Sequence, residues 1–418
     1  MTDLFWPGDE RAGDLFTERA WLAAMVAVEQ AWADALAGAG VAPAAADLSG
    51  LVGAEDLPAL ARAAEGGGNP VIALVGLLRE RADGPAAPWV HRGLTSQDVV
   101  DTALVLCARD TLAQVRADLR HQVAALSGLA RAHRGTVMAG RTLTQHAVPT
   151  TFGLRAAGWL GGVLDAADAL DRPRLPVQIG GAAGTRSAVV DLARASGAAD
   201  PVAAATDLVA GAARRLGLAA AAPWHTSRGT VTALGDALVA CTDAWGRVAA
   251  DVATLSRPEI AEVAEPAAEG RGGSSAMPHK RNPVLSVLVR RAALAAPPLA
   301  STLHLAAALA VDERPDGAWH AEWATLRTLA RRTATAASQT RELLAGLRVD
   351  ADRMAATAEG AREGLTAEAR AITAFTGADT RAEPVGGALP LGAADALIDT
   401  ALARADRFLD TDPPETDT

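Results

Sequence analysis

SQDVVDTALVLCARDTLAQVRADLRHQVAALSGLARAHRG, residues 96–135, is the stretch that decides the fold. Apolar residues recur along it at spacings of three and four, which is the period of one helical face. No proline interrupts the pattern, and Gly135 stands where it stops. We therefore predict a single helix of nearly forty residues, too long for a small compact domain.

Other stretches repeat this helical spacing on both sides of the first one. They cover roughly 14–38, 148–170, 199–216, 227–255, 284–310 and 317–346. Several helices of twenty to forty residues predict an all-α fold built around a long central bundle. Within the stretch 284–310, Pro297 and Pro298 should kink or break the helix, because proline removes a backbone hydrogen bond and clashes with the preceding turn.

The composition agrees with helices rather than strands. Alanine, leucine and arginine dominate the 418 residues, tyrosine is absent, and aromatic residues make up 3%. A chain of this length fits two or three packed parts. We expect an N-terminal helical domain over 1–95, a central bundle over 96–345 with a loop at 270–283, and a C-terminal helical domain over 346–418. Its acidic end, DTDPPETDT, is expected to be disordered.

Charge and cysteine content exclude several functions. A net charge of -10 and a pI near 5.3 argue against a nucleic-acid surface. Cys107 and Cys241 lie in apolar, helix-like stretches and are interpreted as buried small hydrophobic residues. Neither a signal peptide nor an uninterrupted membrane span is visible, so a cytoplasmic protein is expected.

Short polar segments lie between the long helices. HRGLTSQD, residues 91–98, precedes the longest one, and Thr95 or Ser96 is a candidate N-cap with Asp98 in the first turn. Capping alone would explain these residues. The functional alternative is that hydroxyls and amides at a helix start bind a carboxylate.

Two more polar segments have the same position relative to a helix. RTLTQHAVPTT, residues 141–151, offers an arginine, a histidine, a glutamine and hydroxyls, and PWHTSR occupies 223–228. A lone histidine is more often structural than catalytic, but clustering with other polar residues favours a site.

The fourth polar segment is GGSSAMPHKRNP, residues 272–283. Lys280 is the only lysine in the chain, and Asn282 is one of two asparagines. GC-rich codons explain why lysine is scarce, but they do not explain this exception. Lysine is a compact point charge, whereas arginine is a wide planar fork, so a site that keeps lysine indicates a need for the compact cation. The sequence contains no CxxC, HExxH, Walker or GxSxG motif.

This last segment resembles the signature loop SSxMPxKxN of the fumarase/aspartase superfamily, and the other segments follow in the order that the superfamily expects. The resemblance covers nearly the whole chain, to LGAADALID at residues 391–399. It implies an almost all-helical homotetramer whose active sites each take residues from three subunits. It also implies a small polycarboxylate substrate and no cofactor, while the charge and the lack of an apolar span predict neither nucleic acid nor membrane as a partner.

The resemblance assigns roles residue by residue. It makes Ser274 the group that exchanges a proton with carbon, and it gives Lys280 and Asn282, with Met277 beside them in the signature, to the substrate carboxylate. Thr95 and Ser96 are the carboxylate-binding residues of the first segment, and His91 lies beside them. The superfamily's reaction passes through a carbanion stabilised as an aci-carboxylate. A compact ammonium aimed at its oxygens stabilises the charge where it develops.

Within the superfamily, the second segment is similar to that of the 3-carboxy-cis,cis-muconate cycloisomerases, RTxxQHAxPTTFG. Leu143 replaces the histidine of adenylosuccinate lyases, and QIGGAAGT, PWHTSR and GAWHAEW also resemble the cycloisomerases. The implied reaction, part of aromatic catabolism through the beta-ketoadipate pathway, closes the substrate to 4-carboxymuconolactone. The remaining candidates for contacts with substrate are His146, which would orient the attacking carboxylate, together with Arg141, Gln145, Thr226, Arg228 and Arg314.

Two alternatives stay open. One is another lyase on the same scaffold, either adenylosuccinate lyase, against which Leu143 argues, or an eliminase of a substituted succinate such as nitrosuccinate. The other is a non-catalytic structural protein like the lens crystallins, against which an intact Ser274, Lys280 and Asn282 argue.

Overall fold

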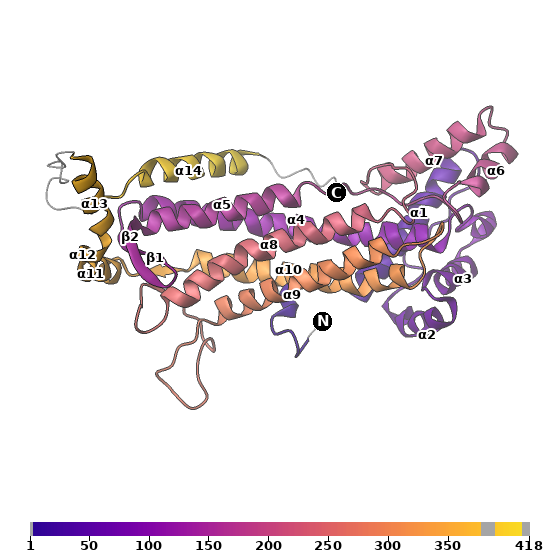
Figure 1. Ribbon diagram of the computed structural model, residues 1–418. Helices are drawn as coiled ribbons and strands as arrows, with labels where there is room; N and C mark the ends of the chain where they lie inside the picture. Colours follow the sequence, from indigo (N-terminus) through magenta and orange to yellow (C-terminus); the bar gives the residue numbers. More distant parts are fainter. Residues whose placement is uncertain (1–2, 378–388, 412–418) are drawn as a thin grey trace.

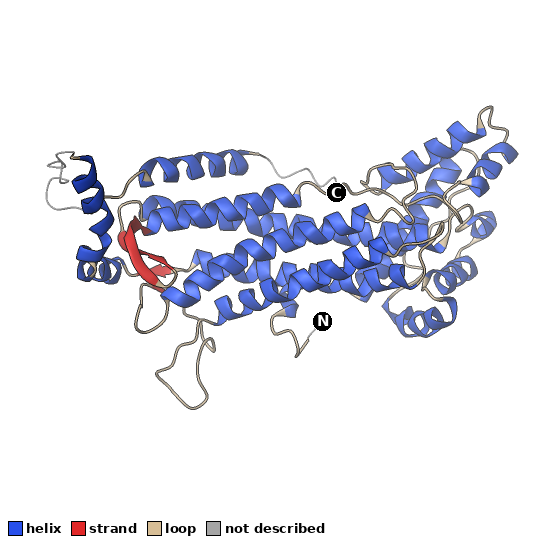
Figure 2. Ribbon diagram, viewed as in Figure 1, coloured by secondary structure: helices blue, strands red, loops and turns tan. Residues whose placement is uncertain are grey.

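The computed structural model describes residues 3–377 and 389–411 of the chain. It is an elongated bundle of long helices with smaller helices at both ends (Figure 1), and helices make up nearly all of its regular structure (Figure 2). The all-α fold predicted from the sequence is confirmed. Most of the acidic tail that was expected to be disordered falls on residues 412–418, outside the described residues.

Five long helices form the bundle. They are α4 (Ser96–Ala132), α5 (Phe152–Leu170), α8 (Gly229–Leu255), α9 (Val284–Ala308) and α10 (Gly317–Ala345). Each corresponds to a predicted stretch, and nine of the ten helix ends lie within three residues of the prediction. Helix α8 packs against α5 and α9, and α10 packs against α4, α8 and α9.

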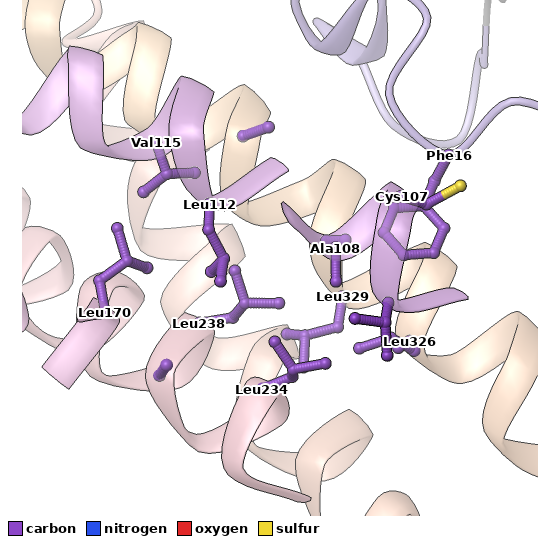
Figure 3. Close-up of a cluster of buried hydrophobic side chains, with 14 of the residues drawn as sticks. Phe16, Cys107, Ala108, Leu112, Val115, Leu170, Leu234, Leu238, Leu326 and Leu329 are labelled. Atoms are coloured by element: carbon purple, nitrogen blue, oxygen red, sulfur yellow. The ribbon is translucent and has the colours of Figure 1, made fainter. Parts of the chain in front are cut away.

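Apolar side chains at helical spacing fill the bundle. Figure 3 shows Leu112 and Val115 of α4 close to Leu170 of α5 and to leucines of α8 and α10. Where α8 meets α9, glycine allows a close approach, since a Cβ at Gly246 would lie 2.5 Å from the Cβ of Ala293. Cys107 and Cys241 are both free and buried, as predicted, and burial raises the pKa of the Cys107 thiol to about 12.

The predicted break in α9 is wrong. The helix runs as one element through Pro297 and Pro298. Ala292, Ala296, Ala300 and Leu303 are buried on both sides of the prolines, so packing against α8 and α10 holds the helix across the missing backbone bonds.

Smaller helices surround the start of α4 at one end of the bundle. They are α1 (Glu18–Gly38), α2 (Leu57–Gly67), α3 (Val71–Arg81), α6 (Ser187–Ala195) and α7 (Pro201–Arg215), with 3-10 turns η2 (Ala54–Asp56) and η3 (Gly84–Trp89). Another 3-10 turn, η1 (Asp9–Ala12), packs on α10, where Arg331 and Asp9 form a buried ion pair of 2.6 Å.

A β-hairpin and short helices lie at the opposite end (Figure 1). The hairpin pairs β1 (Val137–Thr142) with β2 (Gln145–Thr151), and a second small pair joins β3 (Val263–Ala264) to β4 (Arg348–Val349). The helices of this region are α11 (Ala351–Gly360), α12 (Arg362–Leu365), α13 (Ala367–Thr376) and α14 (Ala394–Asp410), the last lying along α4 and α5.

The prediction of helix from residue 148 is wrong for residues 148–151, which belong to β2. Pro149 cannot donate to a helical ladder, and β-branched threonines favour a strand. Helix α5 starts at Phe152, after Thr151, whose side chain accepts a hydrogen bond from the backbone of Leu154.

Helix α9 has an unusually apolar exposed surface. By length and composition it is the one described helix that could cross a membrane, and 33% of its most apolar window is buried. Large apolar side chains on it are exposed, including Val287 (53%), Leu294 (77%) and Leu305 (61%). Exposed apolar side chains along one helix are typical of a surface that packs against another molecule.

Candidate active site

The polar segments singled out in the sequence gather at two opposite ends of the bundle. We call the first the α4 end, which contains residues 91–98, 178–186, 223–228 and Arg314. The second is the loop end, which contains the hairpin 137–151 and the loop 265–283. Helix α4 alone, with 37 residues, spans about 55 Å between them.

At the α4 end, the helix start is built on a buried carboxylate. Thr95 is the N-cap, as predicted, and its backbone N–H donates to Asp98 at 3.0 Å. Asp98 is fully buried and also accepts from the backbone N–H groups of Gly180 and Gly181, both at 2.9 Å, and from Gln178 at 3.1 Å. With its acceptors occupied by the protein, Asp98 fixes the loop against the helix rather than contacting substrate.

The side chain of Thr95 has a different partner. Its hydroxyl accepts a hydrogen bond from the guanidinium of Arg314, which is exposed. Ser96 and Thr226 are half-buried. The first amides of a helix have no partner inside it, so Arg314 and the start of α4 together present donors and positive charge suited to a carboxylate.

Arg228 does not contribute to this set of free donors. Its side chain is fully buried and forms bidentate contacts with Asp101, at 2.7 and 3.0 Å, and with Glu322, at 2.6 to 3.2 Å. Backbone carbonyls take the remaining hydrogen bonds, and the guanidinium lies 4.8 Å from the ring centre of Trp224. All five N–H donors are thereby engaged, so the geometry gives Arg228 a structural role instead of the predicted contact with substrate.

The buried cluster holds two carboxylates and one cation. Burial raises the pKa of Glu322 above its ordinary value, although the Arg228 guanidinium opposes this. Burial alone would lower the pKa of Arg228, but the carboxylates of Asp101 and Glu322 outweigh it and raise that pKa. The cluster joins α4, α10 and the segment before α8, and so fixes the elements that carry Thr95 and Arg314.

Arg141 at the loop end is also paired with an acid. Its guanidinium contacts both oxygens of the fully buried Glu262, at 2.7 and 2.9 Å, which ties the hairpin to the segment preceding the loop. The ion pair engages two of the three guanidinium nitrogens, so the role of Arg141 is mainly structural. Arg314 is therefore the candidate arginine that has no carboxylate partner within the described residues.

His146 lies opposite Arg141 across the hairpin and is exposed, as is Gln145. The turn between the strands consists of Leu143 and Thr144, both with left-handed backbones (φ +46° and +72°). Leu143 is 96% exposed at the tip. A strained, apolar turn that projects into solvent is typical of a segment that contacts another surface.

The signature loop presents Ser274 with its own hydrogen-bond donors. The Ser274 hydroxyl oxygen accepts from the backbone N–H of Met277 at 3.1 Å and more weakly from that of Ala276 at 3.4 Å. Donors aimed at a serine oxygen stabilise the alkoxide that forms when it gives up its proton. These donors are suited to the proton exchange that the family resemblance predicts for Ser274.

The loop is closed by two contacts. At its neck, Asn282 donates to the carbonyl of Gly272 both from its backbone, at 2.8 Å, and from its side chain, at 3.2 Å. At its base, Glu265 accepts from the first amides of α9, at 2.6 and 3.0 Å. Lys280 and Met277 are exposed on the closed loop, and a hollow of about 510 Å³ lies behind it.

The structure therefore brings together some of the sequence candidates and separates others. His91, Thr95, Ser96, Thr226 and Arg314 belong to the α4 end. Arg141, Gln145, His146, Ser274, Met277, Lys280 and Asn282 belong to the loop end.

Sequence reasoning missed the buried acids Glu29, Asp101, Glu262 and Glu322. The one available signal was a single carboxylate within an apolar helical stretch, such as Glu29 in AAMVAVEQAW.

Known proteins resemble this chain over most of its length. A family model described as Lyase matches residues 12–296. Nitrosuccinate lyase of Streptomyces davaonensis is 49% identical over 350 residues, covering 81% of this chain and 73% of that protein. The 3-carboxy-cis,cis-muconate cycloisomerase of Pseudomonas aeruginosa is 43% identical over 351 residues, covering 81% of this chain and 74% of that protein.

A solved structure extends the likeness to both ends of the bundle. The 3-carboxy-cis,cis-muconate lactonizing enzyme of Pseudomonas putida has a TM-score of 0.82 at 30% identity. The match covers 95% of this chain and 97% of that one.

Proposed function

The chain belongs to the lyase family of the fumarase/aspartase superfamily, and we propose that it closes 3-carboxy-cis,cis-muconate to 4-carboxymuconolactone without a cofactor. The observation that carries the proposal is Ser274, whose oxygen receives two backbone N–H groups on a loop that also bears the lone lysine. The relatives named as cycloisomerases support the choice of substrate.

In the proposed reaction, a substrate carboxylate oxygen bonds to a carbon of the same molecule. The electron pair of the attacked double bond moves onto the neighbouring carbon and its carboxylate, giving an aci-carboxylate. Ser274 then donates its proton to that carbon, and the serine oxygen recovers a proton from solvent. Because the nucleophile is intramolecular, the protein has to fold the substrate and manage one proton.

Charge stabilisation divides between the two ends. Lys280 points a compact ammonium at the aci-carboxylate, where negative charge grows in the transition state. Arg314, Thr95 and Ser96 hold a second carboxylate at the α4 end. His146 orients the attacking carboxylate, and Asn282 supports Lys280 by closing the neck of the loop.

The distance between the two ends supports a site that is shared between chains. Thr95 directly precedes α4, and Ser274 lies on the loop between the end of α8 and the start of α9, at the opposite end of the bundle, so we infer that a single copy does not bring them to one substrate. We therefore propose a homotetramer in which the loop end of one copy meets the α4 end of another. The exposed apolar stripe of α9 (Val287, Leu294 and Leu305), with Leu309 directly after the helix, is the surface proposed to pack between copies.

A second candidate substrate is nitrosuccinate. The 49% identity to nitrosuccinate lyase favours it. The same groups would serve the elimination, with the Ser274 oxygen removing a proton from the carbon beside a carboxylate and nitrite leaving from the adjacent carbon.

One experiment separates the candidates. The purified protein is incubated with 3-carboxymuconate, following loss of diene absorbance, and with nitrosuccinate, following nitrite release, with adenylosuccinate as a third substrate. We expect the highest kcat/KM for 3-carboxymuconate. A higher kcat/KM for nitrosuccinate would replace the first proposal with the second. Absence of turnover with all three would favour the structural-protein alternative.

A further inference from the structure

A buried carboxylate holds one of the candidate histidines. Glu29 of α1 is 1% exposed, and its Oε1 lies 2.6 Å from Nδ1 of His91. A carboxylate oxygen accepts a hydrogen bond, so a hydrogen bond at this contact places the hydrogen on Nδ1. The other ring nitrogen, Nε2, has no partner within the described residues and is not among their buried unpartnered atoms, so it faces solvent.

The backbone around His91 is held as firmly as its ring. His91 has a left-handed backbone, with φ +63°. The carbonyl before it, that of Val90, accepts two hydrogen bonds from Arg79 at 2.8 and 3.2 Å. The carbonyl after it, that of Arg92, accepts from the buried indole of Trp32 at 2.7 Å. Such a sparsely populated conformation persists when its surroundings over-determine it, and it is common at functional sites.

The other histidines of the polar segments are placed differently. The rings of His146 and of His279 on the loop 265–283 are exposed and have no hydrogen-bond partner within the described residues. His225 is 4% exposed, and its ring lies against the side-chain amide of Gln178. His91 combines a ring fixed by a buried carboxylate with an open edge, four residues before Thr95.

We propose that Glu29 is a positioning residue of the α4 end, which fixes the tautomer and orientation of His91 so that Nε2 binds a carboxylate of the substrate. The proposal rests on the polycarboxylate substrate proposed above. A ring that donates from both nitrogens carries one positive charge, and it would lie between two negative groups, Glu29 inside the protein and the carboxylate outside. Carboxylate–histidine pairs use the same arrangement to aim the outer nitrogen.

The test uses Glu29→Gln, His91→Gln and the double variant. Glutamine keeps the shape of Glu29 and its acceptor oxygen while removing the charge. Each single variant is expected to raise KM about tenfold with kcat within about twofold of wild type, because a charge-assisted hydrogen bond to the bound substrate is lost. In the His91→Gln background, Glu29→Gln should add little, because Glu29 acts through His91.

Glu65→Gln is the matched control, since Glu65 is an exposed glutamate of the same N-terminal part. It should leave KM and kcat unchanged. Melting temperature is recorded for every variant. An unchanged KM in Glu29→Gln, a tenfold effect that persists in the His91→Gln background, or a rise in KM that follows a loss of stability would each overturn the proposal.

A binding measurement separates this inference from the proposed reaction. Tricarballylate, a tricarboxylate that contains no double bond, is titrated calorimetrically into the assembled protein. We expect Glu29→Gln and His91→Gln to weaken its binding about tenfold. This result would support the positioning role even if 3-carboxymuconate proved not to be the substrate. Equal affinity in wild type and variants, or absence of binding to wild type, would contradict it.

Discussion

At the α4 end, the charged side chains of Asp98, Asp101 and Arg228 are almost fully buried and hydrogen-bonded to other groups of the protein, whereas at the loop end Lys280 and His146 lie exposed. The first arrangement fixes a surface before substrate arrives. The second arrangement leaves Lys280 and His146 exposed on the loop and on the hairpin, respectively. We infer that the α4 end is a rigid surface that binds the substrate, and that the loop end carries the residues that react with it.

Replacing Ser274 should have the largest effect. Ser274→Ala removes the proposed proton donor, whose oxygen accepts from the loop amides, and kcat is expected to fall by about 10³-fold or more. The α4 end is untouched, so affinity for tricarballylate should stay within about twofold of wild type. Steady-state kinetics measures the fall in kcat, and calorimetry measures the affinity for tricarballylate. More than a tenth of wild-type kcat would transfer the proton role to another group, His146 first.

Substitutions in the buried cluster of Arg228, Asp101 and Glu322 test the structural role of the α4 end. Arg228→Met leaves two carboxylates buried without a cation and should destabilise the fold by about 3–5 kcal/mol. Glu322→Gln leaves a balanced pair of Arg228 and Asp101 and should cost about 1 kcal/mol. Chemical denaturation measures both. Equal and small losses of stability would mean that Arg228 is not the structural cation of the α4 end.

Glu322→Gln also gives a prediction about how stability depends on pH. A carboxyl whose pKa is raised on folding stabilises the protein below its unfolded pKa, and that contribution is lost as the pH rises through the raised value. Glu322→Gln removes this contribution, so the stability of the variant relative to the wild type should increase as the pH rises above about 4.5. A stability curve with unchanged slope would contradict the direction of this pKa shift.

Lys280→Arg keeps the charge but changes its shape, and we place its effect below that of Ser274. A planar guanidinium cannot take the position of an ammonium aimed at the aci-carboxylate, so kcat should fall on the order of 10²-fold with little change in KM. Kinetics of this variant show whether the loop end needs the compact cation. Near wild-type kcat would leave codon history as the explanation of the lone lysine.

The smallest expected effect lies at the hairpin tip. Leu143→Asn places a residue that tolerates the left-handed backbone at φ +46°, so stability should rise by up to about 1 kcal/mol. If the exposed tip contacts another copy, activity should fall at the same time. A variant that is both more stable and fully active would remove Leu143 from the proposed interface.

The sequence predicted the long helices because apolar spacing is local. It could not predict the role of Arg228, whose carboxylate partners Asp101 and Glu322 lie 127 and 94 residues away along the chain. A polar segment of the same composition can line a binding site or form buried ion pairs. Which of these occurs depends on the residues that the tertiary fold brings next to it. The strand at 148–151 was missed for a related reason, since its pairing with β1 outweighs the helical spacing that follows it.

The loop residues had a stronger signal than the α4 end. GGSSAMPHKRNP carries an unusual set of residue types in one segment, so Ser274 and Lys280 could be singled out directly. Glu29 could not, because its importance depends on a histidine 62 residues away.

The most direct test of the account is complementation between the two ends. Ser274→Ala and Thr95→Val are each expected to be inactive, and they are mixed after reversible dissociation. Because each site is proposed to take its loop from one copy and its α4 end from another, random reassembly should restore about one quarter of wild-type activity. Ser274→Ala mixed with Lys280→Arg is the control, and it should gain nothing beyond the residual Lys280→Arg activity, since both residues lie on one loop. Failure of the first mixture to regain activity, with subunit exchange verified by native mass spectrometry, would contradict a site shared between chains.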